Sequence, residues 1–121
     1  MPEPSEKFLR QAAEARTRIR EVEPSQVNRL AADGAVLLDV RGQVEYEAGH
    51  IDGAINCRYD RLEGGIEEKI PDKATPIVTY CGGGKRGGIA ADTLQRLGYA
   101  NVSSIAGGYT EYCRAQGSTT D

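Results

Sequence analysis

Short apolar runs that suit buried strands alternate along this chain with segments that suit helices. The expected strands are residues 36–40 (VLLDV), 54–57 (AINC), 77–80 (IVTY) and 102–105 (VSSI), and the expected helices are residues 5–20, 23–30, 43–48, 62–70, 88–97 and 109–115. Strands that alternate with helices predict a parallel sheet rather than a sandwich or a bundle. We therefore expect an α/β fold in which helices cover both faces of the sheet.

The length and composition fit one such domain. The chain has 121 residues, of which 39% are apolar and 27% are charged, as in ordinary globular proteins. We expect residues 1–20 to form an N-terminal helix packed on the domain, residues 21–116 to form the domain, and residues 117–121 to form a flexible polar tail. The apolar residues of the N-terminal helix recur at three- and four-residue steps, and a helix that binds a partner would show the same pattern.

Charge and hydropathy limit the partners. The net charge is -3 and the basic residues do not form a stripe, so no nucleic-acid partner is expected. No apolar run approaches the length of a membrane span, and the segment MPEPSEKFLRQAAEAR lacks the apolar core of a secretory signal. We therefore expect a cytoplasmic protein without a membrane partner.

The cysteines and the histidine do not suggest a metal site. The cysteines are Cys57, Cys81 and Cys113, their number is odd, and none belongs to a C-x-x-C pair. His50 is the only histidine, so we predict no zinc and no other cofactor. In a reducing compartment the three cysteines are expected to be thiols.

The segment TYCGGGKRGG, residues 79–88, joins an expected strand to an expected helix. Gly82, Gly84 and Gly87 fit the G-x-G-x-x-G pattern of dinucleotide-binding loops. Such a loop follows the first strand of its sheet, and an acid follows about 20 residues later, but neither condition holds here. A P-loop is excluded as well, because Thr79 stands where its first glycine belongs and Arg86 where its Ser or Thr belongs. No nucleotide cofactor is therefore expected.

Cys81 gives this loop a different meaning, because it ends the expected strand. The N–H groups of the glycines that follow it can curl around its sulfur, and the next helix points its positive end at the same place. Lys85 and Arg86 add positive charge. All three effects favour the thiolate over the thiol, so Cys81 is a candidate nucleophile. The alternative is a buried cysteine that only fills space.

Three segments make the chain resemble the rhodanese-type sulfurtransferase domains. They are LLDVRGQVEYEAGHIDGAIN (37–56), IVTYCGGGKRGGIAADTLQRLGYANV (77–102) and IAGGYTEY (105–112). The combination of D-V-R…E-Y-x-x-G-H-I-x-G-A, Y-C-x-x-G-x-R and a late Gly-Gly pair is specific, and it covers most of residues 36–112. The resemblance implies a five-stranded parallel sheet flanked by helices. It also implies that Cys81 is catalytic and heads a six-residue loop that ends at Arg86.

The resemblance further implies a reaction. The Cys81 thiolate would take the outer sulfur of thiosulfate as a persulfide and release sulfite, and cyanide or a thiol would then accept the sulfur. The residues expected to bind the substrate are Gly82, Gly83, Gly84, Lys85, Arg86 and Gly87. Arg86 is the best candidate for holding the donor's sulfonate, with Lys85 as a second charge. The chain departs from the family at Gly87, where Ser is frequent, and at Tyr112, where Trp is frequent.

Three other functions stay open at this point. One is a persulfide carrier that passes sulfur to a protein acceptor, and another is a rhodanese-like module that only binds a partner or senses anions. The third is a cysteine phosphatase or arsenate reductase. These enzymes separate Cys and Arg by five residues, whereas four residues separate Cys81 from Arg86, which gives a ring better suited to a sulfur atom than to a phosphate.

Several polar residues are expected to support the site. Asp39 is expected to brace the loop region, and Arg41 to pair with Glu45, as structural rather than catalytic groups. Arg58 is expected to steer anions electrostatically. His50 is expected to be structural. Cys57 is expected to be packed, with resolution of the persulfide as a disulfide as the alternative, and Cys113 is expected to be inert. The pair Gly107-Gly108 is expected to need a positive φ or a close approach of backbones.

Overall fold

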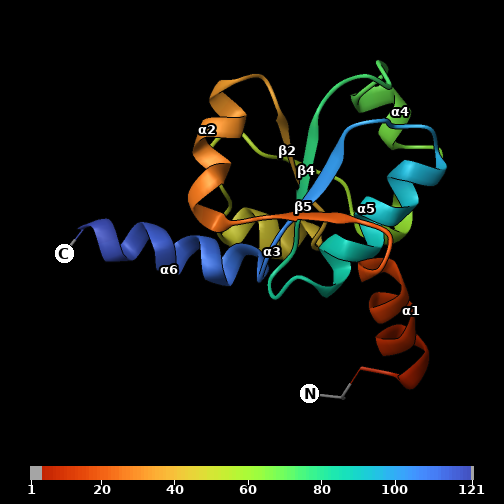
Figure 1. Ribbon diagram of the computed structural model, residues 1–121, viewed down its shortest axis with the longest axis horizontal. Coiled ribbons are helices and arrows are strands. Elements are labelled where there is room, and N and C mark those ends of the chain that lie inside the picture. Colours follow the sequence, from red (N-terminus) through yellow and green to blue (C-terminus); the bar gives the residue numbers. More distant parts are fainter. Residues whose placement is uncertain (1–3, 121) are drawn as a thin grey trace.

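The computed structural model describes residues 4–120, with side chains through residue 116. Its centre is one sheet of five parallel strands in the order β1-β5-β4-β2-β3 (Figure 1). The strands are β1 (Arg20–Val22), β2 (Val36–Asp39), β3 (Ile55–Asn56), β4 (Ile77–Tyr80) and β5 (Val102–Ile105). The predicted α/β fold with a five-stranded parallel sheet is confirmed.

Helices cover both faces of the sheet, because neighbouring residues of a strand point to opposite faces. On one face, α4 and α5 pack against Leu38 and Ile77, and on the other, α2, α3 and α6 pack against Leu37 and Val78. Helix α1 packs on α5 rather than on the sheet. The helices are α1 (Glu6–Arg16), α2 (Val27–Ala32), α3 (Gln43–Ala48), α4 (Ile66–Lys69), α5 (Lys85–Arg96) and α6 (Gly108–Thr120), with short 3-10 turns η1 (Pro24–Gln26) and η2 (Tyr59–Arg61).

Strand β1 was not predicted, because the apolar pattern of the sequence marks only the other four strands. The expected N-terminal helix ran to residue 20, but α1 ends at Arg16 and Arg20 begins a strand that pairs with β5. Two of the three β1 residues are exposed, so the strand has no apolar run. An edge strand of this kind is specified by its partner strand rather than by its own sequence.

Three helices also differ from their expected bounds. Residues 62–70 were expected to be one helix, but Gly64 takes a positive φ of 81° and only Ile66–Lys69 is α-helical. Helix α5 begins three residues earlier than expected, at Lys85 rather than at residue 88. Helix α6 runs to Thr120, so most of the segment expected as a flexible tail is helical, while Asp121 lies outside the described residues.

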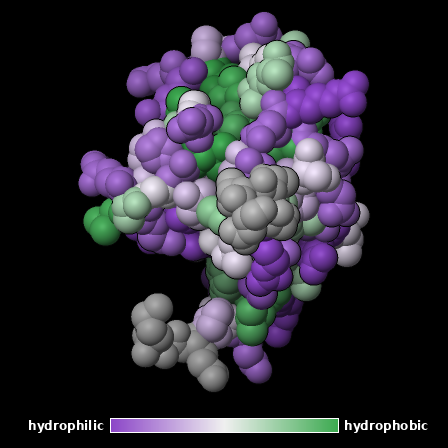
Figure 2. Space-filling view, turned by 90° about the vertical axis from the view of Figure 1, so that its left-hand side faces the viewer, coloured by the Kyte–Doolittle hydropathy of each residue, from purple (hydrophilic) through white to green (hydrophobic). Residues whose placement is uncertain are grey.

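The surface agrees with a chain that keeps its apolar residues inside. The face seen in Figure 2 is covered mainly by hydrophilic residues, with hydrophobic atoms visible in smaller patches between them. Within residues 4–120, no helix combines the length and the apolar composition that crossing a membrane requires.

Candidate active site

Cys81 follows β4, the central strand of the sheet, and its side chain is buried, with 1% of its surface exposed. Ligands of parallel α/β sheets bind beyond the carboxyl ends of the strands, and Cys81 stands at that edge. Residues 81–86, which we call the glycine loop, connect β4 to the first turn of α5. The loop therefore lies at the carboxyl edge of the sheet and at a helix N-terminus, two positions that favour binding of an anion.

A backbone amide of the glycine loop donates directly to the cysteine. The N–H of Gly84 lies 3.0 Å from Cys81 Sγ. Gly84 has a φ of 109°, a left-handed conformation that favours glycine, and it is the residue from which α5 starts. Because α5 begins at Lys85, the free N–H groups of its first turn lie next to the loop. The backbone thus offers positive partial charge to the sulfur.

The first turn of α6 holds the other side of the glycine loop. The N–H of Tyr109 donates to the carbonyl of Cys81 at 2.7 Å, and the N–H of Thr110 donates to the carbonyl of Gly82 at 3.0 Å. The chain has no cis peptide among its described residues, so the N–H of each of these peptides points opposite to its carbonyl. The N–H groups of Gly82 and Gly83 therefore point away from α6.

Gly108 makes this contact between α6 and the loop possible. It has a φ of 65°, and a Cβ on it would lie 2.5 Å from the carbonyl oxygen of Cys81. The expectation that Gly107-Gly108 needs a positive φ and a close approach is confirmed. The part played by the N–H groups of Tyr109 and Thr110 was missed, because no side-chain pattern reports where a backbone amide points.

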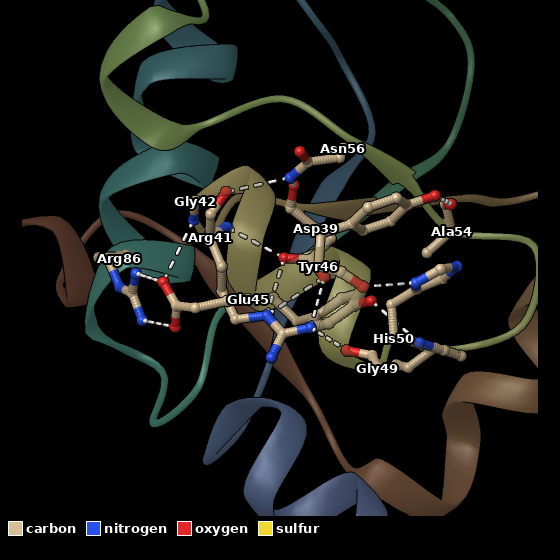
Figure 3. Close-up of polar contacts among 12 residues, drawn as sticks. Asp39, Arg41, Gly42, Glu45, Tyr46, Gly49, His50, Ala54, Asn56 and Arg86 are labelled. Carbon is tan, nitrogen blue, oxygen red and sulfur yellow. Dashed lines mark hydrogen bonds and ion pairs between the residues drawn. The ribbon is translucent and has the colours of Figure 1, made fainter.

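Arg86 lies in the first turn of α5 and forms a bidentate ion pair with Glu45 of α3 (Figure 3). The two nitrogen–oxygen distances are 2.9 and 3.1 Å. The Arg86 guanidinium lowers the pKa of the Glu45 carboxyl, and the carboxylate raises the pKa of Arg86, to which Cys81 also contributes. A nitrogen of Arg86 lies 3.6 Å from where a Cβ on Gly82 would be, so the guanidinium sits over the loop.

Arg41 pairs with Asp39 and not with Glu45, so the expected pair of Arg41 with Glu45 is wrong. Asp39 and Arg41 are both buried, and the shortest of their contacts, Arg41 Nη2 to Asp39 Oδ2, is 2.7 Å. Arg41 also donates to the carbonyl of Gly49 at 2.6 Å and lies over the ring of Tyr109, 4.6 Å from its centre. The carboxylate of Asp39 satisfies Arg41, which leaves Glu45 free for Arg86.

Gly87 packs beneath the loop. A Cβ there would lie 3.0 Å from Ser104 Oγ and 3.2 Å from the Cα of Tyr80, so α5 can approach the sheet this closely only without a side chain at position 87. Its carbonyl accepts a hydrogen bond from the hydroxyl of Thr79. Ser104 Oγ is buried and is the one buried side-chain polar atom in the described part of the chain without a hydrogen-bond partner. A serine at position 87 would therefore require these neighbours to shift by a few tenths of an ångström.

Cys57 and Cys81 are too far apart for a disulfide. Asn56 and Tyr80 both pair with Asp39 from opposite sides of β2, so the cysteines that follow them are separated by two strand spacings. At about 4.8 Å per spacing this is roughly 9.6 Å, beyond the usual limit of about 7 Å between Cα atoms. Burial also raises the pKa of the Cys57 thiol. Cys57 is a packed residue, and Cys113 is exposed on α6.

Arg58 and His50 make their contacts with residues outside the glycine loop. Arg58 immediately precedes η2 and pairs with Asp60 at 3.1 Å rather than with the loop. The ring of His50 stacks on that of Tyr46 at a centroid distance of 3.8 Å, and its Nδ1 lies 2.8 Å from the Tyr46 carbonyl oxygen (Figure 3). Lys85 belongs to the glycine loop, and its side chain is exposed. The described residues include no cluster of three metal-ligating side chains.

The site as a whole can stabilise one negative charge on sulfur. The nearest groups are backbone N–H groups and the Arg86 guanidinium, whose charge is largely balanced by Glu45. Sequence reasoning identified the loop but missed the pairing of Glu45 with Arg86, which lie 41 positions apart. Glu45 lies within the family motif of residues 37–56, so the sequence marked it as a residue of interest but did not indicate that Arg86 is its partner.

Proteins of known sequence are similar to this chain. A sequence model described as the rhodanese-like domain matches residues 23–115. The tRNA uridine(34) hydroxylase of Erwinia tasmaniensis is 38% identical over 95 residues, which cover 74% of this chain and 27% of that protein. The thiosulfate sulfurtransferase PspE of Escherichia coli is 33% identical over 70 residues, which cover 58% of this chain and 67% of that protein.

A solved structure extends the likeness to the whole fold. A protein from Rhodopseudomonas palustris, described as a possible tyrosine phosphatase, superposes with a TM-score of 0.81 and 26% sequence identity over 96% of both chains. The chain spans only 27% of the hydroxylase, so the activity in that protein's name belongs to a much longer molecule. Since the matched residues 23–115 make up most of the chain and contain the glycine loop, the chain belongs to the rhodanese-like domain family.

Proposed function

We propose that this protein is a sulfurtransferase that carries sulfane sulfur as a persulfide on Cys81. The observation that carries the proposal is the backbone N–H of Gly84, 3.0 Å from the sulfur of a buried cysteine at the start of α5. An amide held in place by the fold needs no rearrangement to stabilise an anion that forms there. The relative PspE, a thiosulfate sulfurtransferase, supports thiosulfate as the donor.

The first step moves one sulfur atom from thiosulfate to the protein. The Cys81 thiolate attacks the outer sulfur and forms a new S–S bond, while the S–S bond of thiosulfate breaks and its electron pair leaves with sulfite. The single negative charge of the thiolate ends on the outer sulfur of the persulfide. The N–H groups of Gly82, Gly83 and Gly84 stabilise that charge before and after the transfer.

The second step returns the cysteine. A nucleophilic acceptor, cyanide or a thiolate, attacks the outer sulfur, and the electron pair of the broken bond returns to Cys81 Sγ. Arg86 and Lys85 attract the anionic donor and acceptor in both steps. No metal or organic cofactor takes part, because the sulfur atom itself carries the charge from one step to the next.

Sulfur transfer is preferred to the activities named for two of the similar proteins. Phosphatase chemistry would need room for a tetrahedral phosphate, and only four residues stand between Cys81 and Arg86. Hydroxylation is named for a protein of which this chain spans 27%, whereas the groups needed for sulfur transfer all lie in one loop of this chain.

The test is to treat the protein with thiosulfate and measure its intact mass and its production of thiocyanate from cyanide. We expect an added mass of about 32 Da, one sulfur atom, on the protein and none on Cys81→Ser. An adduct with slow turnover to cyanide identifies a persulfide carrier for another acceptor. Absence of the adduct, or hydrolysis of a phosphate ester that depends on Cys81, would refute the proposal.

A further inference from the structure

Arg41 is a buried charged residue that the proposed sulfur transfer does not use. It exposes 6% of its surface, and its partner Asp39 is fully buried. Asp39 Oδ1 accepts hydrogen bonds from the backbone N–H and from Nε of Arg41, each at 3.0 Å, and Asp39 Oδ2 accepts from Nη2 at 2.7 Å. A buried ion pair of this kind adds little net stability compared with well-packed apolar residues. Its contribution is therefore expected in the geometry that it fixes.

The guanidinium of Arg41 is held from two directions. Besides its contacts with Asp39, Nη2 donates to the carbonyl of Gly49, the residue that follows α3, at 2.6 Å (Figure 3). Because guanidinium N–H groups point within the plane of the group, these bonds leave its flat faces available for packing. The guanidinium carbon lies over the ring of Tyr109, 4.6 Å from its centre, and 5.8 Å from the centre of the Tyr80 ring.

Both rings belong to residues that hold the backbone of Cys81. Tyr80 directly precedes Cys81 in the chain, and the N–H of Tyr109 donates to the carbonyl of Cys81 at 2.7 Å. The centres of the two rings are 5.9 Å apart. Because the peptide between Cys81 and Gly82 is planar and trans, the direction of its carbonyl decides the direction of the Gly82 N–H. Arg41 is therefore linked to an amide of the glycine loop through one ring and one hydrogen bond.

This link acts through position rather than through charge. The carboxylate of Asp39 balances the positive charge of Arg41, and the guanidinium that lies over the loop is that of Arg86. A displacement of about 1 Å in a group that stabilises a reacting atom can slow a reaction about a hundred-fold. A side chain that holds a donor amide in one direction therefore affects the reaction without contact with the substrate.

We propose that Arg41 is a positioning residue, which acts through Tyr109 to hold the backbone N–H of Gly82 in the direction that stabilises an anion on Cys81. This rests on the proposed sulfurtransferase function and identifies the contact that aligns its loop. In the first step, the N–H of Gly82 stabilises the negative charge that begins on Cys81 Sγ and ends on the outer sulfur of the persulfide. Arg41 itself contacts neither the donor nor the acceptor.

The first test is the pH profile of Cys81 alkylation by iodoacetamide, followed on the peptide that contains Cys81 by mass spectrometry. Each variant is compared with its own plateau at high pH, so a change in access to the buried sulfur cancels. We expect Tyr109→Leu, which removes the ring, to shift the midpoint of the profile to higher pH, because the thiolate loses an aligned donor. Tyr109→Phe keeps a ring beneath the guanidinium and is expected to keep the midpoint. The nearby charges of Lys85, Arg86 and Glu45 are the same in every variant.

Tyr112→Leu is the matched control for the loss of a ring. It removes the same side chain from the same helix, where the Tyr112 hydroxyl bonds the Asn28 side chain rather than the loop. Its midpoint is expected to equal that of the unchanged protein. An unshifted midpoint in Tyr109→Leu, or equal shifts in the two leucine variants, would overturn the positioning role.

The second test replaces the guanidinium itself. Arg41→Lys keeps a charge beside Asp39 but loses the flat, forked group. We expect it to lower the limiting rate of persulfide formation from thiosulfate about ten-fold, with the half-saturating concentration changed by less than about two-fold. The control is Arg18→Lys, because Arg18 binds the buried carboxylate of Asp92 through the same two nitrogens, Nε and Nη2, about two turns along α5 from the loop. A loss confined to substrate affinity, or an equal loss in both lysine variants, would contradict the proposal.

The variant that combines Arg41→Lys with Tyr109→Leu decides whether the two residues act along one path. We expect Tyr109→Leu alone to be about ten-fold slow as well, and the combined variant to be no slower than either, because Arg41 acts through a ring that is already absent. Losses that multiply to roughly a hundred-fold would exclude the path through Tyr109. If Arg41→Lys does not fold, the profiles of the Tyr109 variants decide. If thiosulfate leaves no sulfur on the unchanged protein, the proposed function fails, and the alkylation profiles still decide the positioning role.

Discussion

Glu45 controls how much positive charge is available beside Cys81. Its carboxylate balances Arg86 through a bidentate ion pair, and both side chains are partly exposed. In the proposed reaction, a dianionic donor and Glu45 therefore compete for the Arg86 guanidinium. Replacing Glu45 alone therefore tests whether its carboxylate weakens or strengthens donor binding.

We expect Glu45→Gln to lower the KM for thiosulfate about three-fold, because one negative charge is removed beside Arg86 in a partly screened site. The control is Glu47→Gln, which removes the same charge from the same helix but leaves the pair with Arg86 intact. Steady-state kinetics at low salt measure both variants. A KM that rises in Glu45→Gln alone would mean that Glu45 holds Arg86 in its working position.

At the scale of elements, the glycine loop is held between two helix N-termini. Helix α5 presents its first turn toward the sulfur, and α6 binds the carbonyls of Cys81 and Gly82 with its first N–H groups. The second contact depends on Gly108, which leaves room for the carbonyl of Cys81. The positions of two helices thus decide which way the loop amides face.

We expect Gly108→Ala to slow persulfide formation by about a hundred-fold, as the loss of an aligned donor does in other anion sites. Gly53→Ala is the matched control, because Gly53 also has a positive φ, of 83°, but a Cβ there meets no atom within 4 Å. Both variants carry the cost of a left-handed alanine, about 1 kcal/mol. Equal rates of persulfide formation in the two variants would show that α6 does not shape the loop.

The ion pair that attaches α1 to α5 is expected to depend on pH. Arg18 lowers the pKa of the Asp92 carboxyl below its ordinary value of 3.8 in the folded protein. The unfolded chain therefore binds this proton at a higher pH, so the stabilisation is complete well above pH 3.8 and is lost as the pH falls through the lowered pKa.

We expect Asp92→Asn to reduce the free energy of unfolding by about 1 kcal/mol at neutral pH, since Arg18 is partly exposed and the pair is partly screened. The difference from the unchanged protein should shrink in urea titrations taken near roughly pH 3. Glu63→Gln, an exposed acid outside any of the ion pairs among residues 4–116, serves as control. A difference that stays constant with pH would rule out this pair as its source.

At the scale of the molecule, the strand order of the sheet keeps Cys57 from forming a disulfide with Cys81. Cys57 follows β3 and Cys81 follows β4, and these two strands lie on either side of β2. The separation of two strands is imposed by the strand order, not by the residues near either cysteine. In the proposed reaction, Cys57 therefore does not resolve the Cys81 persulfide as a disulfide.

We expect Cys57→Ala to retain full sulfur transfer, with a loss of stability of about 1 kcal/mol from the small cavity it leaves. Oxidation of the folded protein with peroxide should yield no peptide joined by a disulfide between Cys57 and Cys81, because their Cα atoms are too far apart. Peptide mapping without reductant checks this, with Cys113→Ser as the background to exclude links between molecules. Recovery of that disulfide from folded protein would contradict the strand geometry.

Much of the fold and the centre of the site could be predicted from the sequence alone. Alternating apolar runs and helical segments specify a parallel sheet, and a parallel sheet brings the ends of its strands to one edge. Cys81 and the glycines that surround it are neighbours in the chain, so their local pattern is legible without a structure. Strand β1 escaped prediction because its residues are mostly exposed and β5 alone specifies its pairing.

Only the tertiary structure decided which distant groups meet the loop. From the sequence, Glu45 had two candidate partners, Arg41 and Arg86. In the structure Arg41 pairs with the buried Asp39, and Glu45 pairs with Arg86. The N–H groups of α6 bind carbonyls of the loop, and residues of α1 line a cavity together with loop residues, although both helices are far from the loop in the sequence. Short-range patterns encode backbone conformation and burial, whereas the partners of a charge or an amide depend on how whole segments pack, and a single sequence does not record that.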